Sequence, residues 1–235
     1  MRLFNGSELL PPALPLLANH GLGLHASRHL CAAIEPWEHM DQGDLLELFW
    51  NSCFVTAHVV QPGEPGRTMQ LPIPASFALN GEAHLYYRVL RVGYQAQRSP
   101  ALAFSVKLQC PGNPLHGAEE NQFLAPLELP EAVCLNTLKR GVPFSVEPWQ
   151  HMAALDCLTL RWGDLRLDLP PLLPSQVGLP VSGRIPKKVI REAGQDDHLE
   201  ATYCILDRVG NPSGWAPARQ VRVYRDATSI DIPKG

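Results

Sequence analysis

Three histidines near the N-terminus, His20, His25 and His29, lie close to Cys31 and are the residues best suited to holding a metal. Imidazole and thiolate groups are the usual ligands of zinc. The H-x4-H-x3-H spacing fits no zinc finger, and the surrounding segment is typical of an irregular lead-in. We therefore expect ordinary exposed histidines and no cofactor, and metal binding by this cluster stays open.

Two pairs of carboxylates occupy matching places in the chain, Glu35 with Asp44 and Glu147 with Asp156. A general acid and a general base must share one site that separates their pKa values. Duplicated carboxylates that flank a turn more commonly accept hydrogen bonds from backbone amides. The sequence contains no G-x-S-x-G, glycine-rich phosphate loop or H-E-x-x-H motif. We predict that the protein is not an enzyme, although a Ser/His/Asp triad stays open because its members need not be close in sequence.

Tryptophans are the remaining candidates for a functional surface. Trp37 and Trp149 each follow a proline, and Trp215 lies in the turn GNPSGWAP. An exposed indole can stack on a sugar or anchor a protein interface, whereas half-buried packing is the alternative for Trp37 and Trp149. Trp215 has no aromatic counterpart, and it sits in a loop of the kind where such folds bind ligands. We treat Trp37, Trp149 and Trp215 as the possible binding surface.

These tryptophans belong to a sequence that occurs twice. The stretch EPWEHMDQGDLLELFW at 35–50 returns 112 positions later as EPWQHMAALDCLTLRW at 147–162. The match continues at Tyr87 and Tyr203, and at Ser99 and Ala216, where the offset has grown to 117. A period near one hundred residues is a domain length and exceeds that of solenoid repeats. One domain was therefore duplicated.

The domain boundaries follow from proline-marked lead-ins and from a polar connector. Each EPW motif comes about twenty residues after a short proline-bounded segment, at 12–15 and at 126–130. The segment CPGNPLHGAEENQF at 110–123 has the composition of a solvated linker. We expect a first domain over 1–112, a linker over 113–123 and a second domain over 124–235.

Within each unit the apolar residues alternate with polar ones. Leu46, Leu48 and Trp50 lie on one face of their stretch, as do their counterparts at 158, 160 and 162. A period of two predicts half-buried strands. The 23 prolines of the chain favour short strands and turns over long helices. Many short strands separated by turn signals predict an all-β sandwich.

The order of these signals resembles immunoglobulin-like and fibronectin type III-like domains. A Trp ends an early strand, a Tyr-x-Val strand follows later, and Asp207 to Asn211 form a D-x-x-G-N hairpin similar to that of bacterial Ig-like domains. The whole pattern resembles tandem repeats of large pseudomonad and related proteobacterial surface or secreted proteins. The resemblance implies two tandem immunoglobulin-like β-sandwich domains related by internal duplication.

Composition and the first twenty residues indicate which partners and which cellular locations to expect. A net charge of −3 with 18% charged residues provides no basic field for nucleic acid. No run approaches the roughly 20 apolar residues of a membrane span. The first twenty residues, broken by Pro11, Pro12 and Pro15, make a poor signal peptide. We expect a cytoplasmic protein, or one exported without a cleaved N-terminal signal.

Cysteine placement argues against disulfides. Cys157 and Cys204 lie on the strands where an immunoglobulin domain has its bridge, but the alternation points both thiols outward. Outward thiols on two opposite sheets, about 10 Å apart, exceed the roughly 7 Å limit between bridged Cα atoms. We expect mostly free thiols in a reducing compartment. The full set is Cys31, Cys53, Cys110, Cys134, Cys157 and Cys204.

Together these patterns predict a non-enzymatic structural or protein-interaction module with a protein partner. One alternative is a carbohydrate-binding or adhesin-type module that uses the tryptophans. Another is an accessory subunit of a bacterial toxin or secretion system. The fold alone does not decide among them, because such sandwiches serve many functions.

Overall fold

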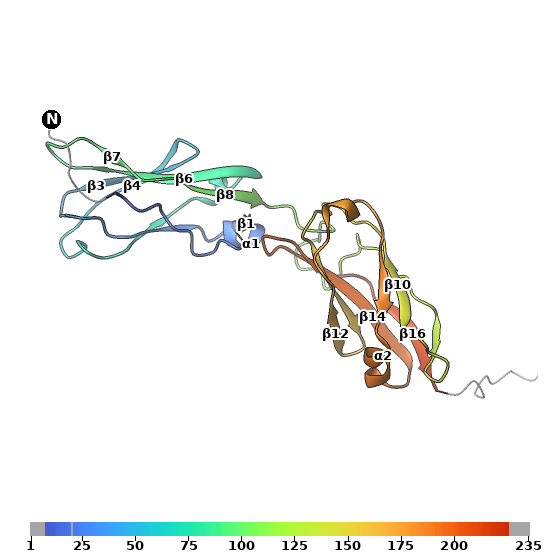
Figure 1. The fold of residues 1–235 in the computed structure, drawn as a ribbon. Helices are drawn as coiled ribbons and strands as arrows, with labels where there is room; N and C mark the ends of the chain where they lie inside the picture. The colour runs from blue at the N-terminus through green and yellow to red at the C-terminus, as the bar shows by residue number, and fades with distance from the viewer. Residues whose placement is uncertain (1–7, 20, 226–235) are drawn as a thin grey trace, which may run out of the picture. The chain divides into compact units, whose positions relative to one another are not determined.

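The structure is a computed structural model that describes residues 8–19 and 21–225. It divides into two compact units, unit 1 over Met1–Leu108 and unit 2 over Gln109–Gly235, both drawn in Figure 1. Both units consist almost entirely of strands. Each has its own hydrophobic core, so each is described separately.

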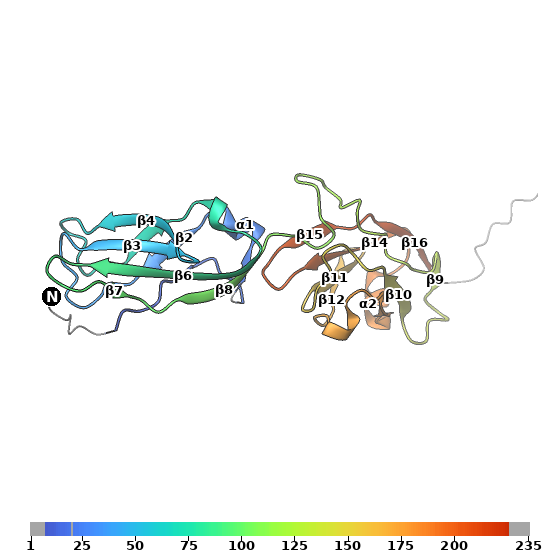
Figure 2. The same cartoon turned by 90° about the horizontal axis from the view of Figure 1, so that it is seen from above.

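Unit 1 contains two sheets. The larger one has the strand order β1-β8-β6-β3-β4, with β7 added on β6. Figure 2 shows its strands β8, β6, β3 and β4 side by side. The smaller sheet pairs β2 with β5. All pairs are antiparallel except β1 with β8. The elements are β1 (Gly21–Gly23), α1 (Leu24–Ser27), β2 (Cys31–Ile34), β3 (Leu45–Trp50), β4 (Cys53–Val59), β5 (Met69–Pro72), a 3-10 turn at Ala75–Phe77, β6 (Gly81–Leu90), β7 (Gln97–Arg98) and β8 (Leu102–Lys107).

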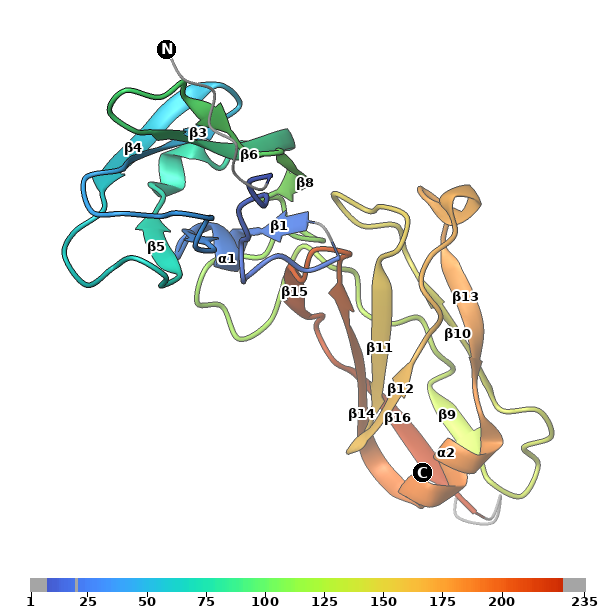
Figure 3. The same ribbon diagram turned by 60° about the vertical axis from the view of Figure 1, so that its left-hand side comes forward.

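Unit 2 repeats this arrangement. Its larger sheet has the order β12-β11-β14-β16-β9, with β15 added on β14, and β10 pairs with β13 side by side as Figure 3 shows. The terminal strands β9 and β16 are again parallel. The elements are β9 (Ala132–Cys134), β10 (Val142–Val146), β11 (Cys157–Trp162), β12 (Leu165–Asp168), a 3-10 turn at Pro174–Gln176, β13 (Val181–Ile185), α2 (Lys187–Ala193), β14 (Asp196–Leu206), β15 (Pro212–Trp215) and β16 (Arg219–Tyr224).

The alternation read from the sequence determines which side chains form the two cores. In β3 and in β11 every second residue is buried and the others are partly exposed. Trp50 and Trp162 end these strands inside their respective cores. Burial of such large aromatic side chains is the main favourable contribution to folding. The prediction of two tandem immunoglobulin-like β-sandwiches is confirmed.

The register of the strands shows which positions of the two units correspond. Glu47 faces Ala57 across β3 and β4. Thr159, which follows Glu47 by 112 residues, faces Asp168 across β11 and β12. The edge strand β4 of unit 1 therefore corresponds to β12 of unit 2, and β6 and β7 correspond to β14 and β15.

The segment 113–123, for which the sequence predicts a solvated linker, is tied to unit 2 near its end. Asn121 is buried, and its side-chain amide donates hydrogen bonds to the carbonyls of Gly112 and Ser213. The amide of Gly112 donates to the carbonyl of Gln150 at 2.8 Å. Because buried backbone groups need partners, these bonds fix the path of the chain into unit 2.

The cysteine prediction was wrong about the sheets. Cys157 on β11 and Cys204 on β14 lie on adjacent antiparallel strands of one sheet, because Cys157 faces Leu206 and Cys204 faces Thr159. Alternation shows on which face a side chain lies, but it does not show which strands pair. All six cysteines are free thiols. Burial is the largest cause that raises the pKa of both Cys157 and Cys204.

The helices α1 and α2 have 4 and 7 residues. Among the described residues, no helix has the length and apolar composition that crossing a membrane requires.

Candidate functional site

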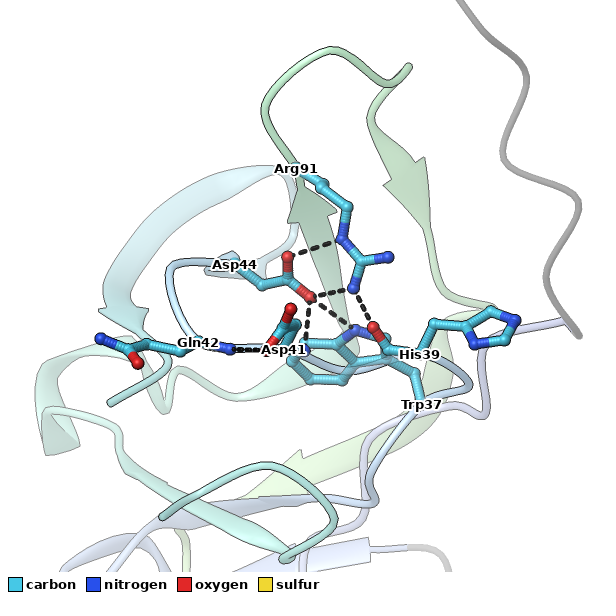
Figure 4. A network of polar contacts seen from close by, with 6 residues as sticks. All are labelled: Trp37, His39, Asp41, Gln42, Asp44 and Arg91. Atoms are coloured by element: carbon cyan, nitrogen blue, oxygen red, sulfur yellow. Dashed lines mark hydrogen bonds and ion pairs between the residues drawn. The ribbon is translucent and has the colours of Figure 1, made fainter. Parts of the chain in front are cut away.

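The turn before β3 surrounds a buried carboxylate, as Figure 4 shows. Asp44 accepts hydrogen bonds from Trp37 Nε1 at 3.3 Å and from the Asp41 amide at 3.2 Å. The guanidinium of Arg91 binds both carboxylate oxygens, with Nε at 2.7 Å and Nη2 at 2.6 Å. The same Nη2 donates to the carbonyl of His39. One carboxylate thus fixes the indole, the turn and the end of β6.

The surroundings of Asp44 change its acidity in two opposite ways. Burial by itself would raise the pKa of this carboxyl group. The hydrogen bonds from Arg91, the Asp41 amide and Trp37, together with the charge of Arg91, outweigh that effect, and the net pKa lies below its ordinary value. The carboxylate is therefore ionised and fully occupied by its own fold.

Unit 2 has the same turn with a different environment. Asp156 accepts from Trp149 Nε1 at 3.1 Å and from the Ala153 amide at 3.0 Å. The position of Arg91 is taken by Asp207, which follows β14 as Arg91 follows β6. Asp207 instead accepts the amide of Asn211 at 2.8 Å within its own hairpin. Both turn carboxylates therefore bond backbone amides.

The histidines that the two turns share have a backbone role. His39 and His151 have φ values of 58° and 61°, in the left-handed region. Such residues are uncommon outside glycine and mark tight turns. Of the N-terminal histidines, His25 and His29 have ring centroids 5.9 Å apart, and His20 lies outside the described residues. Within the described part of the chain no group of three His, Cys, Asp or Glu gathers as metal ligands.

The three candidate tryptophans differ in exposure. Trp37 and Trp149 are 8% and 7% exposed and bind the turn carboxylates, so their rings offer little surface to a ligand. Trp215 on β15 is partly exposed. The guanidinium carbons of Arg161 and Arg166 lie 5.2 and 5.7 Å from a Trp215 ring centroid. A binding role for these indoles stays a prediction.

Unit 1 carries a cluster that the sequence analysis missed, on the outer face of its larger sheet. Phe49 stacks on Tyr86 with ring centroids 5.2 Å apart, and Phe54 meets Phe49 edge-on at 6.0 Å. Arg88 lies over the Phe49 ring at 4.7 Å and Arg98 over the Tyr86 ring at 3.8 Å. We call these five residues the aromatic–arginine face.

The aromatic–arginine face combines apolar surface with the charge of two arginines. Arg88 donates to Glu47 at 3.1 and 2.6 Å and is neutralised by it. None of the ion pairs within residues 8–19 and 21–225 includes Arg98, whose guanidinium lies over the Tyr86 ring. Phe54 is 54% exposed on the edge strand β4. This combination suits contact with a protein surface, where aromatic residues and Arg are enriched.

The corresponding positions of unit 2 have a different chemistry. Arg161 and Arg166 stand where unit 1 has Phe49 and Phe54, because each pair faces its partner across the same two strands. Arg161 is paired with Glu200 at 3.5 Å. The outer face of unit 2 is therefore charged where that of unit 1 is aromatic. Aromatic residues at solvent-side strand positions were the signal that could have located the face in the sequence.

The chain was also compared with known proteins. No family model matches it, and no curated protein matches it. A solved structure of a 1.5-MDa bacterial ice-binding adhesin matches at 12% identity and a TM-score of 0.41, covering 94% of this chain and 67% of that chain. Fibronectin(III)-like modules of Clostridium thermocellum CbhA match at 8% identity and a TM-score of 0.47, covering 92% and 94%.

The FN1-FN3 domains of chicken CNTN1 match at 8% identity and a TM-score of 0.39, covering 92% of this chain and 65% of that chain. The fold assignment rests on the strand order, register and separate cores of the two units. These identify the chain as two tandem immunoglobulin-like β-sandwich domains.

Proposed function

We propose that the chain is a non-enzymatic module that binds a partner protein through unit 1, with unit 2 as its structural companion. The observation that carries this proposal is the aromatic–arginine face. Its side chains stand on the solvent side of a sheet whose other side already packs in the core. Tyr86 is only 8% exposed beneath Arg98, so the surface that the face offers to a partner comes chiefly from Phe54 and the two arginines that cover the rings.

The geometry of the face favours binding at a low entropic cost. Phe49 and Tyr86 hold each other by stacking, and each ring is covered by an arginine. Side chains that are already ordered lose little conformational freedom when a partner docks. Because no ion pair between described residues includes Arg98, its charge calls for a carboxylate on the partner, next to apolar side chains that meet Phe54.

The proposal can be tested with two matched double variants of the full chain. Phe54→Ser with Arg98→Glu removes one apolar side chain and reverses one charge on the face. Leu206→Ser with Arg166→Glu makes the same chemical changes on the outer face of unit 2, where Leu206 is 49% exposed. Each chain is used to capture proteins from the native host, and captured proteins are quantified by mass spectrometry.

We expect a protein that the unaltered chain and the unit 2 variant capture equally, and that the unit 1 variant loses. With that protein purified, the unit 1 variant should bind at least about 30-fold more weakly, as expected for loss of roughly 2 kcal/mol at a hot spot. Equal capture by both variants would contradict the proposal. The identity of the captured protein also distinguishes an adhesin-type module from an accessory subunit of a toxin or secretion system.

If the chain binds a carbohydrate instead of a protein, a different result is expected. Trp215 is the partly exposed candidate indole, so sugar stacking on it should change tryptophan fluorescence. Titration of a glycan panel into the chain and into Trp215→Phe tests this alternative directly. A saturable change that the substitution removes would favour it over a protein partner.

A further inference from the structure

A groove runs along the outer face of the smaller sheet of unit 2, which β10 and β13 form side by side (Figure 3). It consists of two pockets with volumes of about 720 and 560 Å³. Pro130, Pro143 and Arg184 line both pockets, so the two are continuous. Sites for small molecules are usually single concave pockets of about 300–1,000 Å³. Two joined pockets along a strand favour an extended chain segment over a compact ligand.

The first pocket provides apolar walls and hydroxyl groups. Pro130 and Pro143 are exposed there, and the hydroxyls of Ser145 and Ser182 lie 3.3 Å apart across the two strands. Among the described residues that line this pocket, Glu128 carries the one carboxylate. A peptide in this pocket would meet proline rings together with hydroxyl groups that can donate or accept hydrogen bonds.

The second pocket gathers positive charge. Lys139, Arg140 and Arg184 line it and are exposed, and none of its described lining residues is Asp or Glu. None of the ion pairs within residues 8–19 and 21–225 includes these three side chains. The neighbouring Glu131 lines neither pocket and lies 3.6 Å from Arg219. Three cations therefore border one pocket of a chain whose net charge is −3.

The backbone at Gly141 fixes the position of these cations. Gly141 has a φ of 90°, and a Cβ atom there would lie 2.2 Å from the carbonyl oxygen of Ile185. Any other residue would therefore require a shift of the backbone. The Gly141 carbonyl accepts a hydrogen bond from Arg184 Nη1 at 3.2 Å. The loop that carries Lys139 and Arg140 is thus held beside Arg184 before a ligand binds, which lowers the entropic cost of binding.

Unit 1 lacks this set of charges. Arg184 corresponds to Pro72 and Lys139 to Ser27, both at the offset of 112 residues that relates β10 to β2. Of the three cations, only that of Arg140 has a basic counterpart at this offset. The basic groove is therefore a feature of unit 2 and is not a property that the duplicated fold imposes.

We propose that this groove binds an extended acidic segment of another protein. Carboxylates of the segment would pair with Lys139, Arg140 and Arg184, and apolar side chains between them would pack on the rings of Pro130 and Pro143. Charge complementarity argues for such a partner, because opposite charges across an interface favour association and like charges oppose it. The inference goes beyond the proposed function, since it uses unit 2 and no residue of the aromatic–arginine face.

A library of random peptides of about twelve residues, displayed on phage, tests the proposal with the full chain. Peptides are selected on the unaltered chain, and the enriched ones are synthesised and titrated by fluorescence anisotropy. We expect enriched peptides that carry at least two Asp or Glu residues beside apolar ones. Their affinity should fall as sodium chloride is raised from about 0.05 to 0.5 M, because salt screens exposed charges.

Two matched double variants locate the site of peptide binding. Lys139→Glu with Arg140→Glu reverses two charges of the groove and should weaken binding at least about tenfold. Lys188→Glu with Arg191→Glu makes the same change on α2, where neither residue lines the groove, and should bind like the unaltered chain. Arg184 is left in place because it holds the loop. Thermal unfolding verifies that the variants are folded. Lys139→Gln with Arg140→Gln, a milder pair, should weaken binding by a smaller factor.

A selection that enriches no acidic peptides on the unaltered chain overturns the proposal. Equal binding of the enriched peptides by the groove variant, or an equal loss of binding in the α2 variant, overturns it as well. Phe54→Ser with Arg98→Glu separates this inference from the proposed function and should leave binding of these peptides unchanged. Peptides that this unit 1 variant loses and the groove variant keeps belong to the aromatic–arginine face, and that result also overturns the groove.

Discussion

Unit 1 and unit 2 have the same interior and different exteriors. Both bury a Trp whose indole binds a turn carboxylate, Trp37 with Asp44 and Trp149 with Asp156. Their outer faces diverge, as do their edge strands. Packing tolerates few changes because cores are close-packed, whereas solvent-side positions are free to vary. The units therefore differ mainly at solvent-side positions of their strands.

The two units also differ at the residue that follows the long central strand, next to the turn before β3 or β11. In unit 1 the guanidinium of Arg91 compensates the buried charge of Asp44 with two short hydrogen bonds. In unit 2 the same position is Asp207, which holds its own hairpin through the amides of Val209 and Asn211. A buried polar group must be satisfied, but the partner that satisfies it can change.

The largest expected effect is a loss of stability on removing a core tryptophan, and it tests whether the two cores contribute equally to the stability of their units. Trp50→Ala and Trp162→Ala each remove a buried aromatic side chain, so each should lower the free energy of unfolding by about 3–5 kcal/mol. If the units unfold independently, each substitution should shift one of two transitions in differential scanning calorimetry. Trp215→Ala, on the outer face, should shift neither by a comparable amount. A single transition that both substitutions shift equally would show one cooperative unit.

A smaller effect tests the turn network of unit 1. Asp44→Asn keeps the shape of the side chain and removes its charge, so it should lower the free energy of unfolding by about 1–3 kcal/mol at neutral pH. Because the pKa of folded Asp44 is lowered, its contribution is complete above the unfolded pKa of about 4. The contribution is lost as the pH falls through the folded pKa. Urea unfolding from pH 7 to pH 2 measures it.

The difference in the free energy of unfolding between the unaltered chain and Asp44→Asn should therefore become smaller as the pH falls. The control is Asp164→Asn, which changes an exposed carboxylate in unit 2 and should change stability little at any pH. A gap of constant size from pH 7 to pH 2 would mean that the charge of Asp44 does not contribute.

The smallest expected effect concerns the thiols. All six cysteines are free, so melting temperatures with and without dithiothreitol should coincide. A native disulfide typically adds 2–4 kcal/mol, which reductant would remove. Titration of the unfolded protein with a thiol reagent should find most of the six cysteines. Two or fewer thiols, together with a lower melting temperature in reductant, would contradict this expectation.

Sequence patterns were sufficient to predict which side chains form the two cores. They were insufficient to predict which side chains lie together on the surface. The alternation of Leu46, Leu48 and Trp50 shows which side chains are buried, and the duplication shows that this occurs twice. Pairing between distant strands cannot be read from alternation. The cluster of Phe49 with Phe54 depends on a register shift in β3 and β4 that follows Leu48. Which residues share a surface is therefore decided by register.

The parallel pairing of terminal strands has a mechanical consequence. β1 lies parallel to β8 in unit 1, and β9 lies parallel to β16 in unit 2. Tension applied to the two ends of such a domain pulls parallel neighbours in opposite directions, so their hydrogen bonds are loaded in shear. They must break together, whereas an antiparallel pair pulled from one end opens one bond at a time. The parallel pairs β1–β8 and β9–β16 therefore favour resistance of each domain to stretching.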